Sequence, residues 1–410
     1  MRRLKKTLWT KNFTLVTAAS ALGAVGGIAG GFALSFLVFD ETGSTLASAL
    51  ILAIQLVPFF VLPLFLAPVM DRLPRKPFLV AGDLIDGVLY ALMGLYLLKF
   101  EFSYAAYLGY SLLLACLESF DELAFQSIYP KLIPDGMEQQ GYAVSTTLYP
   151  ILRVLMLPLA GVLLDAVGAA WILIGQGGLS LLAALIESNI DITEHRWEGG
   201  EKLFTLRQWR ADIKEAAEYL KNERGVTGIF SYMAVTNGVA SGYSSILVAF
   251  FRTFPGFTAA MYSLFSVFEF AGRTLGGAVQ YKLKIAKEKK FGFTFIVYQI
   301  YELMDMCLLW LPYPLMLANR ALVGFLGANS ATMRQAAMQT YIPEELRARL
   351  NAFQNMLVTA ASGLFALIIG ALGEVLDYRL CVTICGATAF IAAWLLVWRR
   401  RADVRKIFEK

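Results

Sequence analysis

The sequence predicts an all-α polytopic membrane protein in which twelve transmembrane helices form two pseudo-symmetric six-helix bundles. The first observation is composition: of 410 residues, 58% are hydrophobic and 16% are charged. Soluble domains have about 45–50% apolar and about 25% charged residues. The second is a series of apolar runs long enough for spanning helices, which need roughly 20 residues each. The third is an internal repeat that relates the two halves.

The apolar runs define the expected spans in chain order. They cover residues 13–39, 45–69, 77–98, 104–129, 141–166 and 169–188, and then 226–251, 258–281, 291–313, 315–341, 350–376 and 380–398. The first run follows basic residues but extends to Phe39, too far for the apolar part of a signal peptide, so we expect an uncleaved first helix. The chain should therefore comprise an N-terminal bundle (1–188), a cytoplasmic linker (189–225), a C-terminal bundle (226–398) and a cytoplasmic tail (399–410).

The linker contains the segment LRQWRADIKEAAEYLKNE at 206–223, in which apolar residues recur at helical spacing with charges on the opposite face. This pattern predicts an amphipathic helix that lies against the inner membrane surface or the helix bundle. A solvated linker helix with no role in transport would have the same pattern.

The distribution of positive charge predicts the orientation. With the N-terminus inside, 29 of the 36 Lys and Arg residues fall in inner segments, and only Lys99, Arg252 and Arg379 fall in outer loops. Cytoplasmic loops of membrane proteins carry this excess of Lys and Arg. Both termini are therefore expected in the cytoplasm.

An internal repeat supports the division into halves. Gln126, Pro134, Asp135, Ala143, Gly161 and Asp165 recur 209 positions later as Gln335, Pro343, Glu344, Ala352, Gly370 and Glu374. The offset is close to half of the 410 residues. Repeated six-helix halves are typical of transporters that work by rocking one bundle against the other.

The loop after the second span contains a charged motif. Its sequence, Ala67-Pro-Val-Met-Asp71-Arg72-Leu-Pro-Arg75-Lys76, resembles the G-x-x-x-D-R-x-x-R-K signature of the major facilitator superfamily, with Ala67 in place of the glycine. The resemblance implies a cytoplasmic gate, in which a carboxylate among cations approaches the positive N-terminal end of a neighbouring helix. Alternatively, the cations serve only to set the topology.

Other segments resemble one branch of this superfamily, the macrolide-efflux branch of bacterial drug:proton antiporters, which also contains siderophore and lysophospholipid transporters. These segments are Thr42-Gly43-Ser44, Asp83-Leu84, Ile213-Lys214-Glu215 with Asn222, and the loop prolines Pro134 and Pro343. The resemblance implies a multi-pass protein of the bacterial cytoplasmic membrane that exports small molecules by proton antiport.

Charged residues within the spans are candidates for function, because each costs several kcal/mol in the membrane unless it is paired or hydrated. The acids are Asp83, Asp86, Glu118, Asp121, Glu122, Glu269, Glu302 and Asp305, and the cations are Arg153, Arg273, Arg320 and Arg334. Four arginines can neutralise at most four of these acids by simple pairing. The other acids must be protonated, hydrated or in contact with a cation.

Glu118, Asp121 and Glu122 share one helical face. We expect Glu118 and Asp121 to couple transport to protons, with Arg153 as their modulator, in a substrate cavity that also contains Glu122, Glu269 and Glu302. Asp83 is grouped with the cytoplasmic gate, because Asp83 and Asp86 could simply pair with the basic loop at 72–76.

The first span carries Gly23, Gly27 and Gly31 at a spacing of four residues. Rows of small residues allow helices to approach closely, so this stripe predicts helix packing. A face that slides during the transport cycle is the alternative.

These observations favour a secondary transporter that exports amphipathic or lipophilic small molecules, with protons and the lipid bilayer as its other partners. The alternatives are a lysophospholipid or siderophore transporter and a transport-inactive membrane receptor or scaffold. No cofactor, metal, nucleic acid or enzymatic activity is expected, because the chain has one His, no Walker motif and no metal-ligand or nucleophile–base constellation. The superfamily resemblance implies a monomer.

Overall fold

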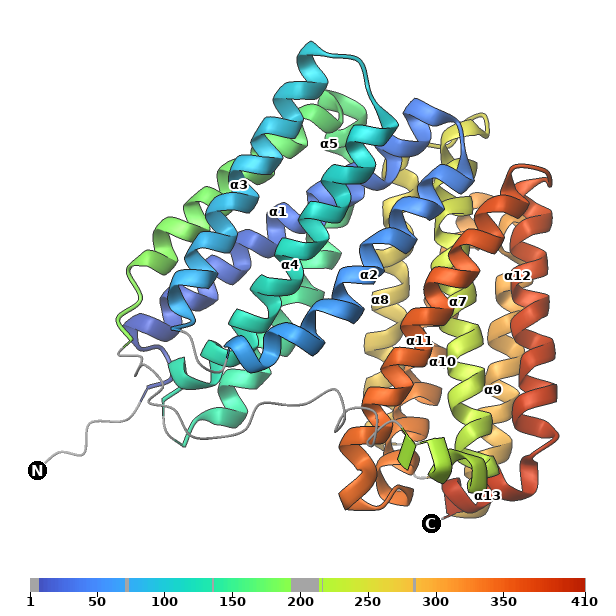
Figure 1. Ribbon diagram of the computed structural model, residues 1–410. Coiled ribbons are helices and arrows are strands. Elements are labelled where there is room, and N and C mark those ends of the chain that lie inside the picture. The colour runs from blue at the N-terminus through green and yellow to red at the C-terminus, as the bar shows by residue number, and fades with distance from the viewer. Residues whose placement is uncertain are drawn as a thin grey trace, which may run out of the picture. The chain divides into compact units, whose positions relative to one another are not determined.

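The computed structural model describes residues 7–70, 74–134, 136–192, 214–215, 217–282 and 285–409. Asp71 and Arg72 of the gate motif and residues 193–213 of the linker lie outside these described residues. Every regular element in the described ranges is helical (Figure 1). The first half contains α1 (Lys11–Thr42), α2 (Thr45–Met70), α3 (Lys76–Lys99), α4 (Tyr104–Leu132) and α5 (Glu138–Ser188).

A single glycine divides α5 into two helical parts. Gly168 has φ 80° and ψ 169° inside the 51-residue helix, a backbone conformation that glycine adopts without the steric cost of a Cβ. This position falls between the expected spans 141–166 and 169–188. The two parts of α5 therefore supply the fifth and sixth spans.

The second half contains the remaining helices. They are α7 (Arg224–Thr253), α8 (Ala259–Lys282), α9 (Lys287–Cys307), α10 (Tyr313–Tyr341), α11 (Glu344–Gly373), α12 (Tyr378–Ala392) and α13 (Arg401–Glu409). A 3₁₀ turn (Leu308–Trp310) follows α9, and a π-helical segment (Ala393–Trp398) extends α12. With α5 counted as two parts, the described helices α1 to α12 correspond one to one with the twelve expected spans.

Hydropathy singles out seven of the described helices as long and apolar enough to cross a membrane, with α5 counted once. Helix α4 is not among these seven. Its acids Glu118, Asp121 and Glu122 show why hydropathy alone misses some spans. A helix that carries buried charges for function scores low on a scale that measures only transfer into lipid.

The chain forms two compact units. The first comprises Met1–Thr42, Ile54–Leu203 and Thr258–Ser263, and the second comprises Gly43–Ala53, Phe204–Phe257 and Leu264–Lys410. The first turns of α2 and α8 are thus assigned to a different unit from the rest of each helix.

The start of α2 is bound by an acidic residue of the second unit. The Glu374 carboxylate, just after α11, accepts hydrogen bonds from the Leu46 backbone N–H (2.9 Å) and the Ser44 hydroxyl (2.7 Å). Gly370, one turn earlier, lies so close to α2 that an added Cβ would come within 2.5 Å of the Ala49 Cβ. Glycine therefore permits the contact that the carboxylate stabilises.

The start of α8 is bound in the same way within the first unit. The Asp165 carboxylate of α5 accepts a hydrogen bond from the Ala260 backbone N–H (3.3 Å), and a Cβ added at Gly161 would lie 2.7 Å from the Ala260 Cα. Gly161 and Asp165 are the repeat counterparts of Gly370 and Glu374. The sequence repeat thus encodes two equivalent contacts between a carboxylate and the positive N-terminal end of a helix.

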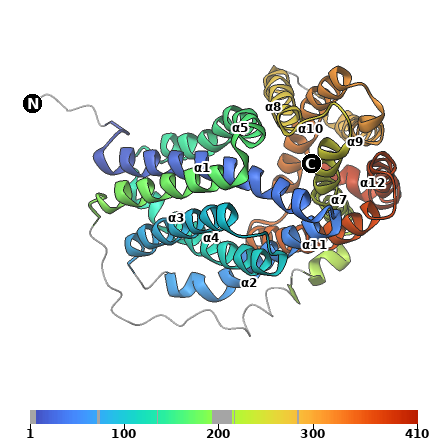
Figure 2. The ribbon, with the colours of Figure 1, turned by 90° about the horizontal axis from the view of Figure 1, so that it is seen from above.

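The two units have separate apolar cores. In the first, α1 packs along α5, and α3 packs against α5 as well (Figure 2). In the second, α7 packs against α11 and α12, and the tail helix α13 inserts Val404, Ile407 and Phe408 into the core. Residues 217–222 of the linker are helical, and Leu220 is buried in that same core. This part of the linker packs against the bundle.

The glycine stripe of α1 makes no close contact. A Cβ added at Gly23, Gly27 or Gly31 would meet nothing within 4 Å, whereas one at Gly26 or Gly30 would press against the Gln176 side chain of α5. The close helix packing expected at Gly23, Gly27 and Gly31 therefore occurs at the adjacent glycines, because that face of α1 points toward α5.

Candidate functional site

The first unit contains a cluster of carboxyl groups, which we call the acid cluster, between α3, α4 and the second part of α5. It consists of Asp83, Asp86, Glu118, Asp121 and Glu187. Asp83 and Asp86 lie one turn apart on α3, and Glu118 and Asp121 lie one turn apart on α4, so each helix presents two acids on one face. Glu187, near the end of α5, is only 3% exposed.

The acid cluster is held by contacts among acids and hydroxyl groups. The carboxyl groups of Asp83 and Glu187 lie within hydrogen-bonding reach of each other. The Tyr90 hydroxyl lies near the Glu118 carboxyl, and the Ser180 hydroxyl lies 3.5 Å from Asp86. Gly82 leaves room for Asp121, whose Oδ1 lies 3.0 Å from where a Cβ would be.

No Lys or Arg of the described ranges lies within ion-pair distance of the acid cluster. Like charges this close in a membrane interior cannot all be ionised at once without a large cost. The simplest way to neutralise them is to bind protons or a cationic ligand.

Glu118 and Asp121 lie one turn apart on α4, beside the acids of α3 and α5. Asp83, expected at the gate, lies beside Glu187 of α5. Arg153 on α5 is exposed and makes no contact with Glu118 or Asp121 among the described side chains.

The other two described gate residues lie at the start of α3. Arg75 precedes the helix, and the Lys76 ammonium donates a hydrogen bond to the Ser188 carbonyl at the end of α5 (2.8 Å). Lys76 of the gate motif thus contacts the end of the sixth span.

Glu122 lies apart from the acid cluster. It accepts a hydrogen bond from Gln126, one turn further along α4. It also lines a separate cavity of about 380 Å³ between α1, α4 and α5, together with Thr17 and Tyr129. Glu122 therefore lies in a different environment from Glu118 and Asp121, although the three share one helical face.

Glu187 was missed by sequence analysis because it lies at the edge of its span, two residues before Asn189, where an acid looks solvated. The only signal in the sequence for a further buried acid was that α3 and α4 each carry two acids one turn apart. Tyr90 was missed for a different reason, since a tyrosine in an apolar run resembles an ordinary core residue.

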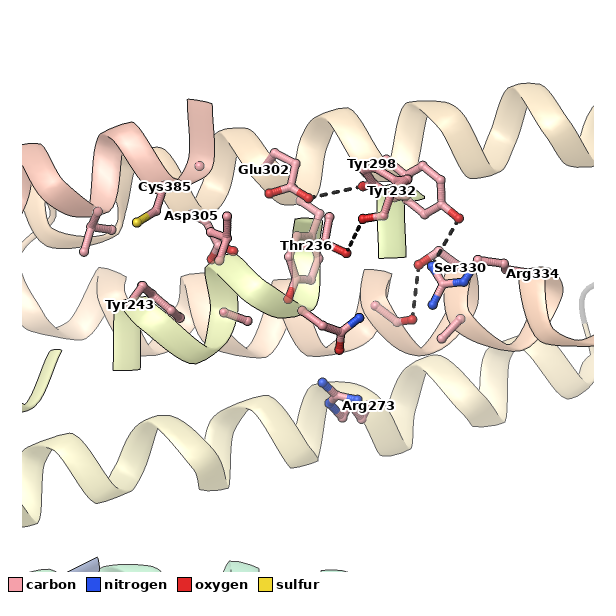
Figure 3. Close-up of a pocket in the computed structure, with 18 residues that line it drawn as sticks. Tyr232, Thr236, Tyr243, Arg273, Tyr298, Glu302, Asp305, Ser330, Arg334 and Cys385 are labelled. Carbon is pink, nitrogen blue, oxygen red and sulfur yellow. Dashed lines mark hydrogen bonds between the residues drawn. The ribbon is translucent and has the colours of Figure 1, made fainter. Parts of the chain in front are cut away.

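The second unit contains a polar cavity of about 300 Å³, which we call the C-unit cavity (Figure 3). Helices α7, α8, α9, α10 and α12 contribute to its wall. Tyr298, Glu302 and Asp305 lie on one face of α9, at spacings of four and three residues, and all three line the cavity. Four tyrosines and four charged residues take part in the lining, so the cavity is both aromatic and charged.

One of the acids that line the C-unit cavity, Asp305, belongs to an ion pair. Arg320 of α10, 3% exposed, forms a short salt bridge with Asp305. The guanidinium also donates to the Tyr243 hydroxyl (2.8 Å) and to the Asn319 side-chain oxygen (3.0 Å). A buried charge pair is tolerated when its geometry is good and further hydrogen bonds satisfy both partners. The two terminal nitrogens of Arg320 meet this condition, whereas its Nε is buried without a hydrogen-bond partner among the described groups.

The second acid of α9 has no such partner. Glu302 is 4% exposed and accepts a hydrogen bond from the Tyr232 hydroxyl of α7 (3.2 Å). Glu269 of α8 is different, because it forms a salt bridge with Arg273 one turn away (2.7 Å). Of the two C-terminal acids expected in the substrate cavity, only Glu302 lines this one.

Within the described ranges, no group of three or more His, Cys, Asp or Glu side chains has a geometry that could hold a metal ion.

Two multi-helix units that each bury charged residues define a polytopic membrane transporter. The sequence profile of the Major Facilitator Superfamily matches residues 13–300 and 300–409, and the chain belongs to this family. It is therefore a multi-pass secondary transporter and not an enzyme. No curated protein sequence matches the chain closely enough to count as a relative.

Solved structures of this fold match nearly the whole chain. A bacterial homologue of the human lysosomal transporter Spinster, in an inward-facing unoccupied conformation, gives a TM-score of 0.66 at 14% identity, covering 97% of this chain and 94% of that chain. A peptide transporter, POT, in complex with alafosfalin gives 0.72 at 11% identity, covering 99% and 98%. The nucleoside transporter NupG gives 0.68 at 11% identity, covering 95% and 99%. The expected fold class is confirmed.

Proposed function

We propose that the protein exports amphipathic or lipophilic small molecules from the cytoplasm in exchange for protons. In this proposal it is a monomer of the bacterial cytoplasmic membrane, with both termini inside, and a member of the macrolide-efflux branch. The acid cluster is the observation that carries the proposal. A group of neighbouring carboxyls that ranges from buried Glu187 to exposed Glu118, without a described cation beside it, is suited to take up and release protons.

Proton exchange in this account takes place at Glu118 and Asp121. The two carboxyls are one turn apart on α4, and the charges of both act on Asp86 of α3. Binding of a proton at one carboxyl therefore changes the free energy of ionising the others. A cationic substrate that neutralises the same carboxyls competes with protons, and this competition couples the two movements. Arg153 modulates the coupling if it approaches the cluster during the cycle.

A second candidate is a lysophospholipid transporter of the same superfamily. The C-unit cavity favours it, because the cavity presents both signs of charge beside aromatic rings, as a phospholipid headgroup with an ammonium and a phosphate requires. A transport-inactive receptor would need neither the acid cluster nor the cavity.

Transport in proteoliposomes tests the proposal. Vesicles with an acidic lumen and a clamped membrane potential should accumulate ethidium, a permanent cation that a pH gradient alone cannot trap. Glu118→Gln and Asp121→Asn should abolish this accumulation, because a neutral amide cannot exchange a proton with either side. Glu101→Gln, an acid of the loop between α3 and α4, is the matched control and should transport normally.

Two results would contradict the proposal. Ethidium that never accumulates under a pH gradient would exclude proton-driven export of this cation. Undiminished accumulation in the Glu118→Gln, Asp121→Asn double variant would place coupling outside these two carboxyls. Thermal unfolding of each variant in detergent controls for folding.

A further inference from the structure

Four charged residues line the C-unit cavity, and two of them form salt bridges that the structure describes. Asp305 forms its salt bridge with Arg320, and Arg273 forms its salt bridge with Glu269. The two charges that remain have opposite signs: Glu302 on α9 and Arg334 on α10. Neither has an ion-pair partner among the side chains that the structure describes.

The environment of Glu302 suits an ammonium group. Its carboxyl accepts a hydrogen bond from the Tyr232 hydroxyl and has a second oxygen available to a ligand. Tyr232, Tyr298 and Tyr301 line the same cavity. Aromatic rings beside a carboxylate bind an ammonium both by cation–π attraction and by charge.

The environment of Arg334 suits an anion. Its guanidinium donates one hydrogen bond to the Tyr298 hydroxyl (3.2 Å) and lies 5.9 Å from the centre of that ring. A guanidinium has five N–H donors in a planar fork, so four remain for a carboxylate or phosphate. Ser330, one turn before Arg334 on α10, adds a hydroxyl to the same wall.

A pair of tyrosine rings keeps the two charges apart. Tyr232 and Tyr298 pack with their ring centroids 4.7 Å apart. Tyr232 binds Glu302, and Tyr298 binds Arg334 (Figure 3). Two opposite charges in a low-dielectric cavity attract strongly unless the structure holds them apart. The tyrosine pair holds them apart, and a ligand that carries both charges can bridge it.

We infer that the C-unit cavity binds the zwitterionic end of an amphipathic molecule, with the ligand's ammonium at Glu302 and its phosphate or carboxylate at Arg334. This deepens the proposed function, on which it rests for the direction of transport, by naming the substrate class. A zwitterion satisfies the buried Glu302 and the half-buried Arg334 at once. A ligand with a single charge leaves one of them without a counter-ion, which is costly in a buried site.

Three probes with the same 12-carbon chain test the inference without any gradient. They are lysophosphatidylethanolamine, which has both charges, lysophosphatidic acid, which has only the phosphate, and dodecylamine, which has only the ammonium. Binding to the purified transporter is measured by scintillation proximity with radiolabelled probes. The zwitterion should bind about tenfold or more tightly than either single-charge probe, since losing one buried charge contact costs at least that much. Equal binding of all three probes would overturn the inference.

Variants assign each charge to its residue. Glu302→Gln should weaken the binding of the zwitterion and of dodecylamine but not of lysophosphatidic acid. Arg334→Gln should weaken the binding of the zwitterion and of lysophosphatidic acid but not of dodecylamine. Glu101→Gln and Arg399→Gln remove one charge of each sign outside the cavity and should leave all three affinities unchanged. A uniform loss for every probe in both cavity variants would mean a structural role and would overturn the assignment.

The binding panel and the transport assay fail independently. A zwitterion preference without pH-driven transport would refute proton coupling and leave the cavity assignment standing. Proton-driven transport of ethidium without any zwitterion preference would refute the cavity assignment and leave proton coupling standing.

Discussion

At the residue scale, the salt bridge between Arg320 and Asp305 is the contact whose loss should cost most. Removing one partner of a buried ion pair leaves the other charge uncompensated, and this costs about 3–5 kcal/mol. We therefore expect Arg320→Met to lower the unfolding temperature in detergent sharply. Tyr243→Phe, which removes one neutral hydroxyl donor, should cost about 1 kcal/mol.

A double variant separates charge from packing. Arg320→Met combined with Asp305→Leu leaves no charge behind and should recover much of the stability that Arg320→Met loses. If the double variant unfolds at as low a temperature as Arg320→Met alone, the pair contributes through side-chain volume and not through charge compensation.

Sequence analysis named the charged residues within the spans, but it did not identify which of them form ion pairs. Counting eight acids against four arginines correctly indicated that some acids lack a counter-ion, and Glu302 is one of them. It could not show that Asp305 pairs with Arg320. Helical spacing shows which residues share a face of α9, but it does not show how that face is oriented toward α10. Glu187 shows the same limit, since its burial depends on α5 continuing beside α3 to its last turn.

At the element scale, two helix starts are bound by carboxylates. Burial opposes ionisation of Glu374, but hydrogen bonds from the Leu46 backbone, Ser44 and Thr45 outweigh it and lower the pKa of Glu374 below its usual 4.5. A lowered pKa in the folded state means that the stabilisation is fully present above pH 4.5 and is lost as the pH falls through the lowered value. The contact therefore persists at neutral and mildly acidic pH.

Glu374→Gln tests this contact. The variant should be less stable at pH 7 by about 0.3–1 kcal/mol, the range for an exposed charge at a helix terminus. The difference from the unmodified chain should shrink below pH 4.5, where Glu374 itself becomes protonated. Unfolding temperatures measured from pH 3.5 to 7.5 give the comparison, and a difference that stays constant over this range would rule out the charge as the cause.

The helix pattern itself was largely predictable. Apolar runs placed the fifth and sixth spans on either side of Gly168, where the structure breaks α5, and the repeat singled out Asp165 and Glu374. The contacts of these acids were not predictable, because Glu374 binds a segment 328 positions earlier in the chain. Periodicity carries no information about such distant partners.

At the scale of the whole molecule, each unit holds one set of charged residues, and the two sets differ in composition. The first unit collects acids around Glu118 and Asp121, and the second balances Glu302 against Arg334. In our account the first set exchanges protons in competition with a cationic substrate, and the second binds the zwitterionic end of an amphipathic one. This division assigns the two halves of a repeated fold to different tasks, although they arose from the same pattern of spans.

The exchange of protons for substrate is the central claim, and the most direct measurement follows luminal pH while a substrate gradient drives transport. Proteoliposomes are loaded with ethidium and a trapped pH indicator, with no initial pH difference and a clamped membrane potential. Dilution into ethidium-free buffer should acidify the lumen as ethidium leaves, and the Glu118→Gln, Asp121→Asn double variant should show no acidification. Ethidium that leaves through the unmodified protein while luminal pH stays constant would contradict the account.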